Sequence, residues 1–543
     1  MKNMIRISSL KLKINHNEND ILNAAAEKLR SDPADITALK IVKKSLDARD
    51  KSSIHWNYII DVSVKNEAHI LKSFKNNRNI TMADNTVYKL PRQGTQPPAA
   101  RPCITGSGPA GLFCAYFLAK EGYRPVLIEQ GEPVAQRLKT AEKFWKEGIL
   151  NPSSNIQFGE GGAGTFSDGK LNTGVSDKSG RIKLVLETFV ENGAPEEILY
   201  SNRPHIGTDI LSKVVENMRN RIIGWRGEVL FNTKFVDFAM RNGKLVSIAL
   251  ESRNEVIIKP CTALILAPGN SARDTFAMLE SMGVDIEAKA FAAGVRTVHL
   301  KEDINRAMYG PGYDSSLPPA DYRLTYKAKD GRGVYTFCMC PGGYVVNSSS
   351  EEECLCINGM SLSKRDGKYS NSAVVVTVSP EDTGADKNPM LGIEFQRELE
   401  RKAYKEGAGF IPVQRLGDFK ERSADKNASL NMQEAFKGNA GYADINRILP
   451  EYICSDIKEA FDEFGKKIKG FDDPDTLLCA VESRTSCPIR IKRDEHFESN
   501  IKGIFPAGEG TGYAGGITSS AIDGIKVFEE IYSRYAPEIN ANF

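Results

Sequence analysis

The sequence has no long apolar run and no clear export signal. Its apolar stretches, such as residues 262–267, are short, whereas a membrane-spanning helix needs roughly 20 apolar residues. Residues 1–10 alternate polar and apolar side chains and lack the unbroken apolar segment of a secretory signal. These absences predict a cytoplasmic protein that does not enter a membrane.

The sequence also lacks an excess of charge of either sign. Its 72 Lys and Arg balance 70 Asp and Glu, and the net charge of +2 argues against a protein that coats nucleic acid along its whole length. Ten cysteines are scattered over 543 residues, unlike the dense disulfide framework of a small secreted domain, which favours free thiols. The six histidines stand at no spacing typical of a metal site, so no metal site is predicted.

The apolar content of 41% can form several hydrophobic cores, and about 150 residues per domain predicts three or four domains. Residues 1–90 read as strand, helix, two strands, helix and strand. This βαββαβ order is typical of a ferredoxin-like module. Residues 91–100 are rich in proline and small residues, which predicts a linker.

The first ninety residues carry a local charge excess. They contain 16 Lys/Arg and 10 Asp/Glu, a net charge of +6. A contiguous basic face on this module would suit RNA or an acidic protein partner. An ordinary solvated surface explains the same residues, and it is the interpretation that we favour.

The strongest motif follows the linker. A strand at 102–105 leads into the turn Gly106-Ser-Gly-Pro-Ala-Gly111, a helix, and a second strand that ends at Glu129. The three glycines permit the tight turn, the approach of a pyrophosphate and close packing of helix and strand. The helix N-terminus offers N–H groups to phosphates, and Glu129 can accept hydrogen bonds from a ribose. The segment therefore predicts a dinucleotide site.

Three further segments fit the same kind of ligand. Residues 156–173 form a glycine-dense loop that can wrap backbone amides around a cofactor. Residues 263–273 read as an apolar strand, a Pro-Gly turn and a helix. Residues 504–524 read as a strand, a glycine-rich turn and a helix whose dipole can face a flavin edge that gains negative charge.

In these motifs the chain resembles a bacterial family of FAD-dependent dehydrogenases, most of whose members are uncharacterised. The resemblance covers nearly the whole length. The matching motifs are Gly106–Gly111, Phe158–Thr173, Ala267–Asp274, Cys338–Gly343 and Gly508–Gly516. The resemblance implies bound FAD and an oxidoreductase, and it leaves the substrate open.

The implied fold is α/β, with a glutathione-reductase-like Rossmann FAD-binding domain split into residues 101–289 and 478–543. An α+β substrate or cap domain, residues 290–477, is inserted between the two parts. The N-terminal module of residues 1–90 and the linker 91–100 precede them. The residues expected to bind the cofactor are Gly106, Ser107, Gly108, Pro109, Ala110, Gly111, Glu129, Gln130, Arg137, Gly161, Gly162, Ala163, Gly164, Thr165, Lys170, Val236, Ala267, Gly269, Gly508, Glu509, Gly515, Gly516 and Ile517.

Three residues are expected to take part in catalysis: Cys338 and Cys340, which form a C-x-C pair, and Arg484 at the predicted domain seam. Thiols can receive electrons from a reduced flavin, and a guanidinium can bind a substrate carboxylate or stabilise an anionic flavin. A structural role for the cysteines, which we favour, and an interdomain salt bridge for Arg484 are the alternatives. A zinc site that adds Cys354 and Cys356 is a further alternative.

The sequence therefore predicts an FAD-dependent oxidoreductase that transfers a hydride between flavin and a small organic substrate. No second fingerprint marks a dedicated NAD(P)H domain, but NAD(P)H can bind transiently over the flavin as an electron donor. The alternative is a flavin-dependent RNA-modifying or RNA-binding protein that docks through residues 1–90.

Overall fold

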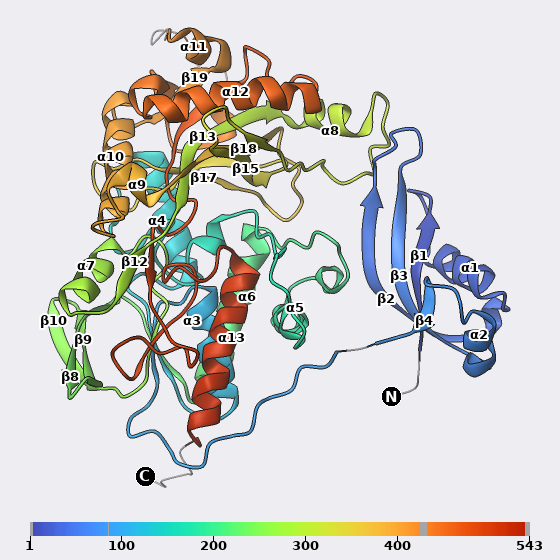
Figure 1. Cartoon of the computed structure of the whole chain (residues 1–543), viewed down its shortest axis with the longest axis horizontal. Helices are drawn as coiled ribbons and strands as arrows, with labels where there is room; N and C mark the ends of the chain where they lie inside the picture. The colour runs from blue at the N-terminus through green and yellow to red at the C-terminus, as the bar shows by residue number, and fades with distance from the viewer. Residues whose placement is uncertain (1–3, 85, 424–431, 538–543) are drawn as a thin grey trace.

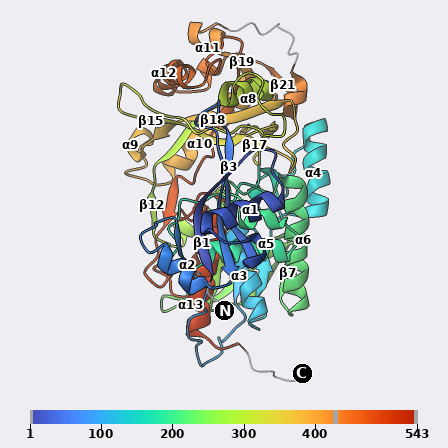
Figure 2. The same cartoon turned by 90° about the vertical axis from the view of Figure 1, so that its right-hand side faces the viewer.

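The computed structural model describes residues 4–84, 86–423 and 432–537. The N-terminal module lies to one side of the molecule, and the two larger parts of the chain are stacked one above the other (Figure 1). Figure 2, turned by 90°, shows the module in front of the lower part, with the upper part extending beyond it.

The N-terminal module has the predicted order of elements: β1 (Ile5–Leu12), α1 (Glu18–Leu29), β2 (Ile36–Asp47), β3 (His55–Val64), α2 (Glu67–Ser73) and β4 (Ile80–Met82). The strands form an antiparallel sheet in the order β2-β3-β1-β4. Ile5 and Ile7, which alternate along β1, pack with Ile21 and Leu29 of α1 in a core of the module's own residues.

A five-stranded parallel sheet forms the centre of the lower part. Its order is β24-β11-β5-β6-β7, which places a late strand beside early ones, as in doubly wound folds. The strands are β5 (Cys103–Thr105), β6 (Val126–Ile128), β7 (Glu228–Leu230), β11 (Leu264–Leu266) and β24 (Ile504–Pro506). The strands of this sheet's centre are buried on both faces, which explains their continuous apolar sequence.

The helices of the lower part are α3 (Pro109–Lys120), α4 (Val134–Glu147), α5 (Arg181–Glu191), α6 (Thr208–Gly224), α7 (Arg273–Ser281) and α13 (Ile517–Arg534). Helices α3 and α13 pack very closely, because a Cβ on Gly524 would lie 2.1 Å from the Ala110 carbonyl oxygen. The two helices that follow β5 and β24 thus bring their N-termini to the same end of the sheet.

A smaller antiparallel sheet contains β8 (Thr233–Arg241), β9 (Lys244–Ser252) and β10 (Glu255–Pro260), in the order β10-β9-β8. Residues 228–236 and 244–251 read from the sequence as strands of a hairpin or a three-stranded layer. The three-stranded sheet forms, but residues 228–236 are not one strand. The segment forms β7 and β8, which belong to different sheets. Asn232 lies between them with φ +50°, in the left-handed region that interrupts a strand.

The upper part contains a seven-stranded sheet in the order β14-β15-β18-β13-β22-β19-β21. Its strands are β13 (Phe291–Leu300), β14 (Thr325–Lys327), β15 (Gly333–Cys340), β18 (Tyr369–Val378), β19 (Ile411–Arg415), β21 (Ala440–Tyr442) and β22 (Leu477–Glu482). Its helices are α8 (Lys301–Tyr309), α9 (Pro380–Thr383), α10 (Leu391–Glu406), α11 (Leu416–Glu421) and α12 (Glu451–Lys467). Helix α12 packs Phe461 and Phe464 into the core beneath β13 and β18. A three-stranded sheet, β17-β16-β20, lies beside it, built from β16 (Tyr344–Asn347), β17 (Ile357–Met360) and β20 (Phe436–Lys437).

Two chain crossings connect the upper and lower parts. Strand β12 (Ile286–Ala288) leads upward and β23 (Ile489–Ile491) returns, and the two pair antiparallel. Strand β22 still pairs with β13 and β19, so the upper sheet extends to Glu482. The predicted boundary at residue 477 therefore falls at the start of a strand of the upper sheet.

The N-terminal module touches the rest of the chain through polar contacts and through four half-buried apolar side chains that pack against the core of the upper part: Ile14, Leu46, Ala48 and Ile54. The Lys44 amide donates to the Tyr200 carbonyl (2.7 Å), and the Lys51 ammonium donates to the Ala307 carbonyl (2.7 Å). The Asn15 amide donates to Asp314 (2.9 Å). Across the described ranges, no helix is both long and apolar enough to cross a membrane.

Because the module has its own core, we expect a truncated chain that begins at residue 96 to fold and to retain FAD. The truncated chain loses hydrogen bonds that contribute about 1 kcal/mol or less each. It also loses the packing of four half-buried apolar side chains, which is small beside the core that the upper part keeps. Circular dichroism during heating and the flavin content of the purified protein measure the outcome. A truncated chain that is soluble and cooperatively folded but binds no flavin contradicts this prediction.

Candidate functional site

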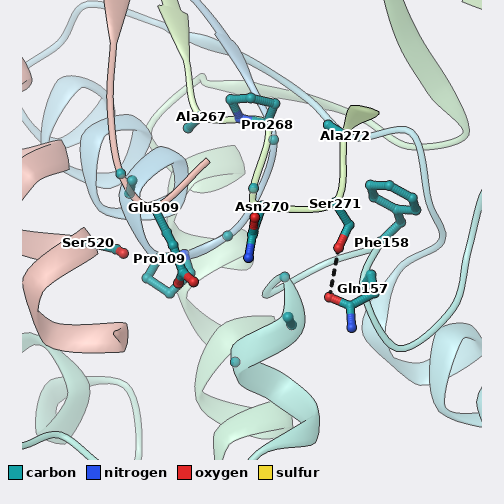
Figure 3. Close-up of a pocket in the computed structure, with 18 of the residues that line it drawn as sticks. Pro109, Gln157, Phe158, Ala267, Pro268, Asn270, Ser271, Ala272, Glu509 and Ser520 are labelled. Atoms are coloured by element: carbon teal, nitrogen blue, oxygen red, sulfur yellow. Dashed lines mark hydrogen bonds between the residues drawn. The ribbon is translucent and has the colours of Figure 1, made fainter. Parts of the chain in front are cut away.

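A cavity of about 380 Å³ opens at the carboxyl ends of the parallel strands. Its wall combines the turn after β5, the glycine-dense loop, the start of α13 and several residues of the upper part. Figure 3 shows Pro109, Asn270 and Glu509 around this space. Cofactor sites fall in a similar size range, about 300–1,000 Å³, and at this edge of α/β sheets.

The turn after β5 has the geometry that its glycines predict. Gly106 has φ +91°, and a Cβ there would lie 2.1 Å from the Ala267 carbonyl oxygen. A Cβ on Gly111 would lie 1.9 Å from the Gly106 carbonyl oxygen. These two glycines are therefore required by the fold, and they let α3 begin directly at the cavity.

Gly108 and Gly162 face each other across the wall of the cavity. An ideal Cβ on Gly108 would lie 3.8 Å from the Gly162 Cα, and one on Gly162 would lie 3.0 Å from the Gly108 Cα. The fingerprint turn and the glycine-dense loop thus present bare backbone to the same space. A pyrophosphate group needs such an approach.

Glu129 connects the fingerprint to the loop. Its carboxylate accepts hydrogen bonds from the Ser107 amide (2.9 Å), the Ser107 hydroxyl (2.7 Å), the Gly131 amide (2.9 Å) and the Gly159 amide (3.0 Å). Glu129 also lines the cavity. Glu129, which the sequence predicts to accept hydrogen bonds from a ribose, therefore also fixes the backbone of the fingerprint turn and of the glycine-dense loop.

Arg137 lies behind the cavity wall. Its buried guanidinium donates to the carbonyls of five loop residues, at 2.7–3.2 Å; they are Asn155, Ile156, Gly159, Glu160 and Gly162. The group also stacks over the Phe166 ring, and burial lowers the pKa of Arg137 to about 10. The structure therefore corrects the sequence prediction, because Arg137 holds the loop in shape and does not line the cavity.

Most of the residues predicted to bind the cofactor line the cavity: Gly106, Gly108, Pro109, Ala110, Glu129, Gln130, Gly162, Ala163, Gly164, Lys170, Ala267, Gly269, Gly508, Glu509, Gly515, Gly516 and Ile517. The predicted residues outside the lining are Ser107, Gly111, Arg137, Gly161, Thr165 and Val236. For Val236 the reason is its register on β8, since Thr233, Lys234 and Phe235 line the cavity in its place.

Sequence reasoning missed several lining residues, among them Gln157, Asp168, Asn270, Ser271, Asn358 and Glu482. The Ser271 hydroxyl donates to the Gln157 amide oxygen (3.1 Å), and both side chains are seen at the cavity edge in Figure 3. Gln157 and Asn270 lie within segments that the sequence analysis identifies, the loop 156–173 and the motif Ala267–Asp274. Asn358 and Glu482 come from the upper part and carry no such signal.

Cys338 lines the cavity, whereas Cys340 does not. A β-bulge in β15 separates Phe337 from Cys340, and Cys338 has φ +45°, so the bulge turns the Cys338 side chain out of the strand's regular alternation. The Cys340 thiol donates to the Cys338 carbonyl (3.3 Å). Hydrogen bonding from Cys340, aided by the Arg296 charge, outweighs burial and lowers the pKa of Cys338 to about 6.

Lys170 joins the glycine-dense loop to this bulge. Its ammonium donates to the Met339 carbonyl and pairs with Asp168 (2.9 Å). The Arg296 guanidinium donates to the Cys338 carbonyl (3.0 Å) and to Glu482 (2.9 Å) from the other side. Both cations fix the backbone on which the two cysteines stand.

Glu509 is a further titratable group that lines the cavity. Its carboxyl group projects into the open space in Figure 3. Burial raises the pKa of Glu509 to about 7, although Lys289 acts in the opposite direction. A carboxyl with such a pKa can exchange a proton near neutral pH.

Arg484 lines the cavity, but its guanidinium is engaged in a buried network. It donates twice to Glu400 (2.9 and 2.7 Å), and to Ser271 (2.9 Å) and Ser350 (2.6 Å). Arg273 of α7 also donates twice to Glu400, at 2.9 and 2.8 Å. Burial acts to raise the pKa of Glu400, but the two arginines outweigh it and hold that pKa well below its usual range. The geometry thus corresponds to the interdomain salt bridge that the sequence left as an alternative.

Within the described residues, no group of three or more His, Cys, Asp or Glu side chains is arranged to hold a metal ion. Cys356 faces the Ser348 hydroxyl at 3.5 Å.

Comparisons with known proteins cover nearly the whole chain. Residues 290–485 match the family described as FAD-dependent protein, C-terminal domain-like, and residues 104–153 match the NAD(P)-binding Rossmann-like domain. Residues 4–63 match a domain of unknown function, DUF8436. An uncharacterized protein of Clostridium beijerinckii is 44% identical over 537 residues, which are 98% of this chain and 99% of that protein.

Several solved flavoprotein structures are similar at low identity. Escherichia coli quinol fumarate reductase matches with 13% identity and a TM-score of 0.37, over 83% of this chain and 72% of that chain. The FAD complex of Bacillus halodurans glycerol-3-phosphate dehydrogenase matches with 11% identity and a TM-score of 0.34, over 80% and 64%. Bacillus cereus glycine oxidase matches with 10% identity and a TM-score of 0.30, over 80% and 94%.

We expect Gly108→Val to lower FAD affinity by at least about tenfold in a folded protein, because the branched side chain enters the space between Gly108 and Gly162. Gly108→Ala is the matched control, since a single Cβ there meets only an ordinary 3.8 Å contact. Flavin titration followed by fluorescence gives the affinities. Equal affinity for the Val variant and the native chain contradicts the placement of the pyrophosphate at this turn.

We expect Cys338 to react with iodoacetamide with a midpoint near pH 6, because its thiolate forms above its lowered pKa. Cys340→Ala should raise the midpoint by removing the hydrogen bond, and Cys340→Ser should keep it low. Cys356 should stay unreactive, since burial raises its pKa to about 12. Mass spectrometry after short pulses between about pH 5 and 9 measures each site. A Cys338 midpoint near an ordinary thiol value of ~8.5 would refute the assignment.

Proposed function

The chain belongs to the family of FAD-dependent proteins that includes its Clostridium beijerinckii relative, and we propose that its cavity binds FAD and uses it to move a hydride to or from a small organic substrate. The observation that carries this proposal is the bare backbone of Gly108 and Gly162, which face each other at the start of α3. A dinucleotide pyrophosphate fits such a place and an ordinary apolar ligand does not.

Other lining residues would bind the two ends of FAD on either side of the pyrophosphate. Glu129, Gln130 and Thr233–Phe235 would hold the adenosine end. Gly164, Gly515 and Gly516 would lie against the flavin end, because they border the start of α13. The positive end of this 18-residue helix would stabilise negative charge on the flavin.

When bound, FAD supplies the hydride chemistry. The upper part, through Phe337, Cys338, Asn358 and Glu482, would close the cavity on the side opposite the fingerprint and exclude water from the substrate. Burial raises the pKa of Glu509 and hydrogen bonding from Cys340 lowers the pKa of Cys338, so that both side chains, which line the cavity, would hold or move a proton beside the substrate. NAD(P)H would act as a transient electron donor in the same space.

Arg484 is proposed as a positioning residue. Its charge is compensated by Glu400, so it would act on the reaction by fixing Ser271, Ser350 and the seam between the two parts. Cys340 would act through Cys338, whose pKa it lowers. Of the three residues predicted for catalysis, only Cys338 is proposed to contact the flavin or the substrate.

We also propose the division of the chain into an N-terminal ferredoxin-like module (1–90), a linker (91–100), a split FAD-binding domain (101–289 and the segment after the insert) and an inserted domain. The sheet order β2-β3-β1-β4 supports the first assignment. The pairing of β22 with β13 moves the end of the insert from residue 477 to about residue 482.

The purified protein is expected to contain one FAD per chain, seen as absorbance near ~450 nm, that NADH or NADPH reduces under anaerobic conditions. Arg484→Ala should retain FAD but slow this reduction by about tenfold and lower the melting temperature, because Glu400 loses one of its two buried partners. Arg484→Lys should be intermediate, since lysine cannot reproduce the bidentate pair.

The matched control is Arg332→Ala, which breaks an ion pair with Asp382 away from the cavity and should leave reduction unchanged. A protein that shows no flavin absorbance even after FAD is added would refute the proposed function. An Arg484→Ala variant with native reduction rate would refute only the positioning role.

A further inference from the structure

Strand β10 is an exposed apolar edge. Val256, Ile257 and Ile258 are 63%, 52% and 63% exposed. The strand pairs with β9 on one side, and within the described part of the chain it has no strand on the other. Figure 1 shows β10 on the outer rim of the lower part, on the side away from the N-terminal module. Natural proteins usually protect such edges with charge, a bulge or a covering segment, so an open apolar edge indicates an interaction site.

The hairpin geometry determines which backbone groups are free. Arg253 and Asn254, with φ +51° and +65°, form a two-residue turn between Ser252 and Glu255, which are paired. In such a turn the flanking pair is hydrogen-bonded, and bonded positions alternate along the strand. The N–H and C=O groups of Val256 and Ile258 therefore point to the open edge, whereas Ile257 and Lys259 bond to β9.

Pro260 ends this edge. By the same alternation its position faces outward, where it has no N–H to donate. Pro260 therefore removes no hydrogen bond between β9 and β10, and it limits any pairing on the open side to the segment 255–259. A short edge of this kind can pair with one strand but gives little support to an extended stack.

We propose that β10 pairs antiparallel with β10 of a second copy of this chain, about a two-fold axis at Ile257. This register places Val256 opposite Ile258 of the second copy, and the free N–H and C=O groups of each pair satisfy one another. It also places Glu255 opposite Lys259 of the second copy, and the symmetry repeats this contact. The sequence Glu255-Val-Ile-Ile-Lys259 is thus complementary to itself in charge and in hydrogen bonding.

This self-complementarity favours a second copy over an unrelated strand. A two-fold contact is closed, so it forms a dimer and no fibre. The two Ile257 side chains meet at the axis, where their exposed surface is removed from water together with that of Val256 and Ile258. The Lys259 ammonium lies 3.6 Å from the Glu228 carboxylate of its own chain. In the dimer it would interact both with Glu228 and with Glu255 of the second copy.

The pairing is tested first by cross-linking of the full chain carrying Ile257→Cys. At a non-hydrogen-bonded pair the Cα atoms are about 4.5 Å apart, within the range of a disulfide, so mild oxidation should give a covalent dimer. Met240→Cys is the control, because Met240 is 44% exposed on β8 of the same sheet but far from the axis. The native cysteines are buried or half-buried. Equal cross-linking of both variants, or of neither, overturns the proposal.

The second test is light scattering during size-exclusion chromatography at about 1 to 100 µM chain. The native chain should be dimeric. Ile258→Lys should give monomers, and Glu255→Lys should weaken the dimer about tenfold, because two attractive contacts become repulsive. Thermal unfolding like that of the native chain shows that these exposed substitutions leave the fold intact. A native chain that is monomeric throughout, or a dimer that neither substitution weakens, overturns the proposal.

Discussion

The glycine-dense loop of residues 156–173 depends on two buried charged side chains for its shape. A segment with so few side chains cannot pack itself, and its backbone groups still need partners. Arg137 donates to four of its carbonyls and to that of Asn155 just before it, and Glu129 accepts a hydrogen bond from one of its amides together with those of Ser107 and Gly131. The opposite charges of these two residues thus fix the wall that the proposed cofactor would contact.

A second buried charge joins the upper part of the molecule to the lower part. Glu400 is fully buried and accepts two hydrogen bonds from each of two arginines, Arg273 below and Arg484 at the seam. Such a network adds little net stability compared with apolar packing, but the loss of one member leaves charge unpaired and is costly. It therefore defines one relative position of the two parts more than it strengthens their contact.

The sequence was sufficient to predict the parallel sheet and the fingerprint turn, because the constraints on Gly106 and Gly111 are local and the apolar strands are short and regular. The sequence was not sufficient where contacts between distant segments of the chain determine the structure. Nothing near Arg137 indicates which carbonyls it will meet, and the apolar strand Leu477–Glu482 does not reveal the sheet that it joins. On β8 the lining includes Thr233, Lys234 and Phe235 but not Val236, and no pattern in the sequence marks this limit.

The paired crossing strands β12 and β23 have a mechanical consequence. Since both connections between the upper and lower parts run side by side and are bonded along Ile286–Ala288 and Ile489–Ile491, with Glu287 and Arg490 joined at 3.1 Å, they act as one narrow ribbon. A ribbon of two strands resists stretching and lateral shear but twists and bends easily. Any change in the relative position of the upper and lower parts would therefore have to twist or bend this ribbon and also break a pair that Glu400 makes with Arg273 or Arg484.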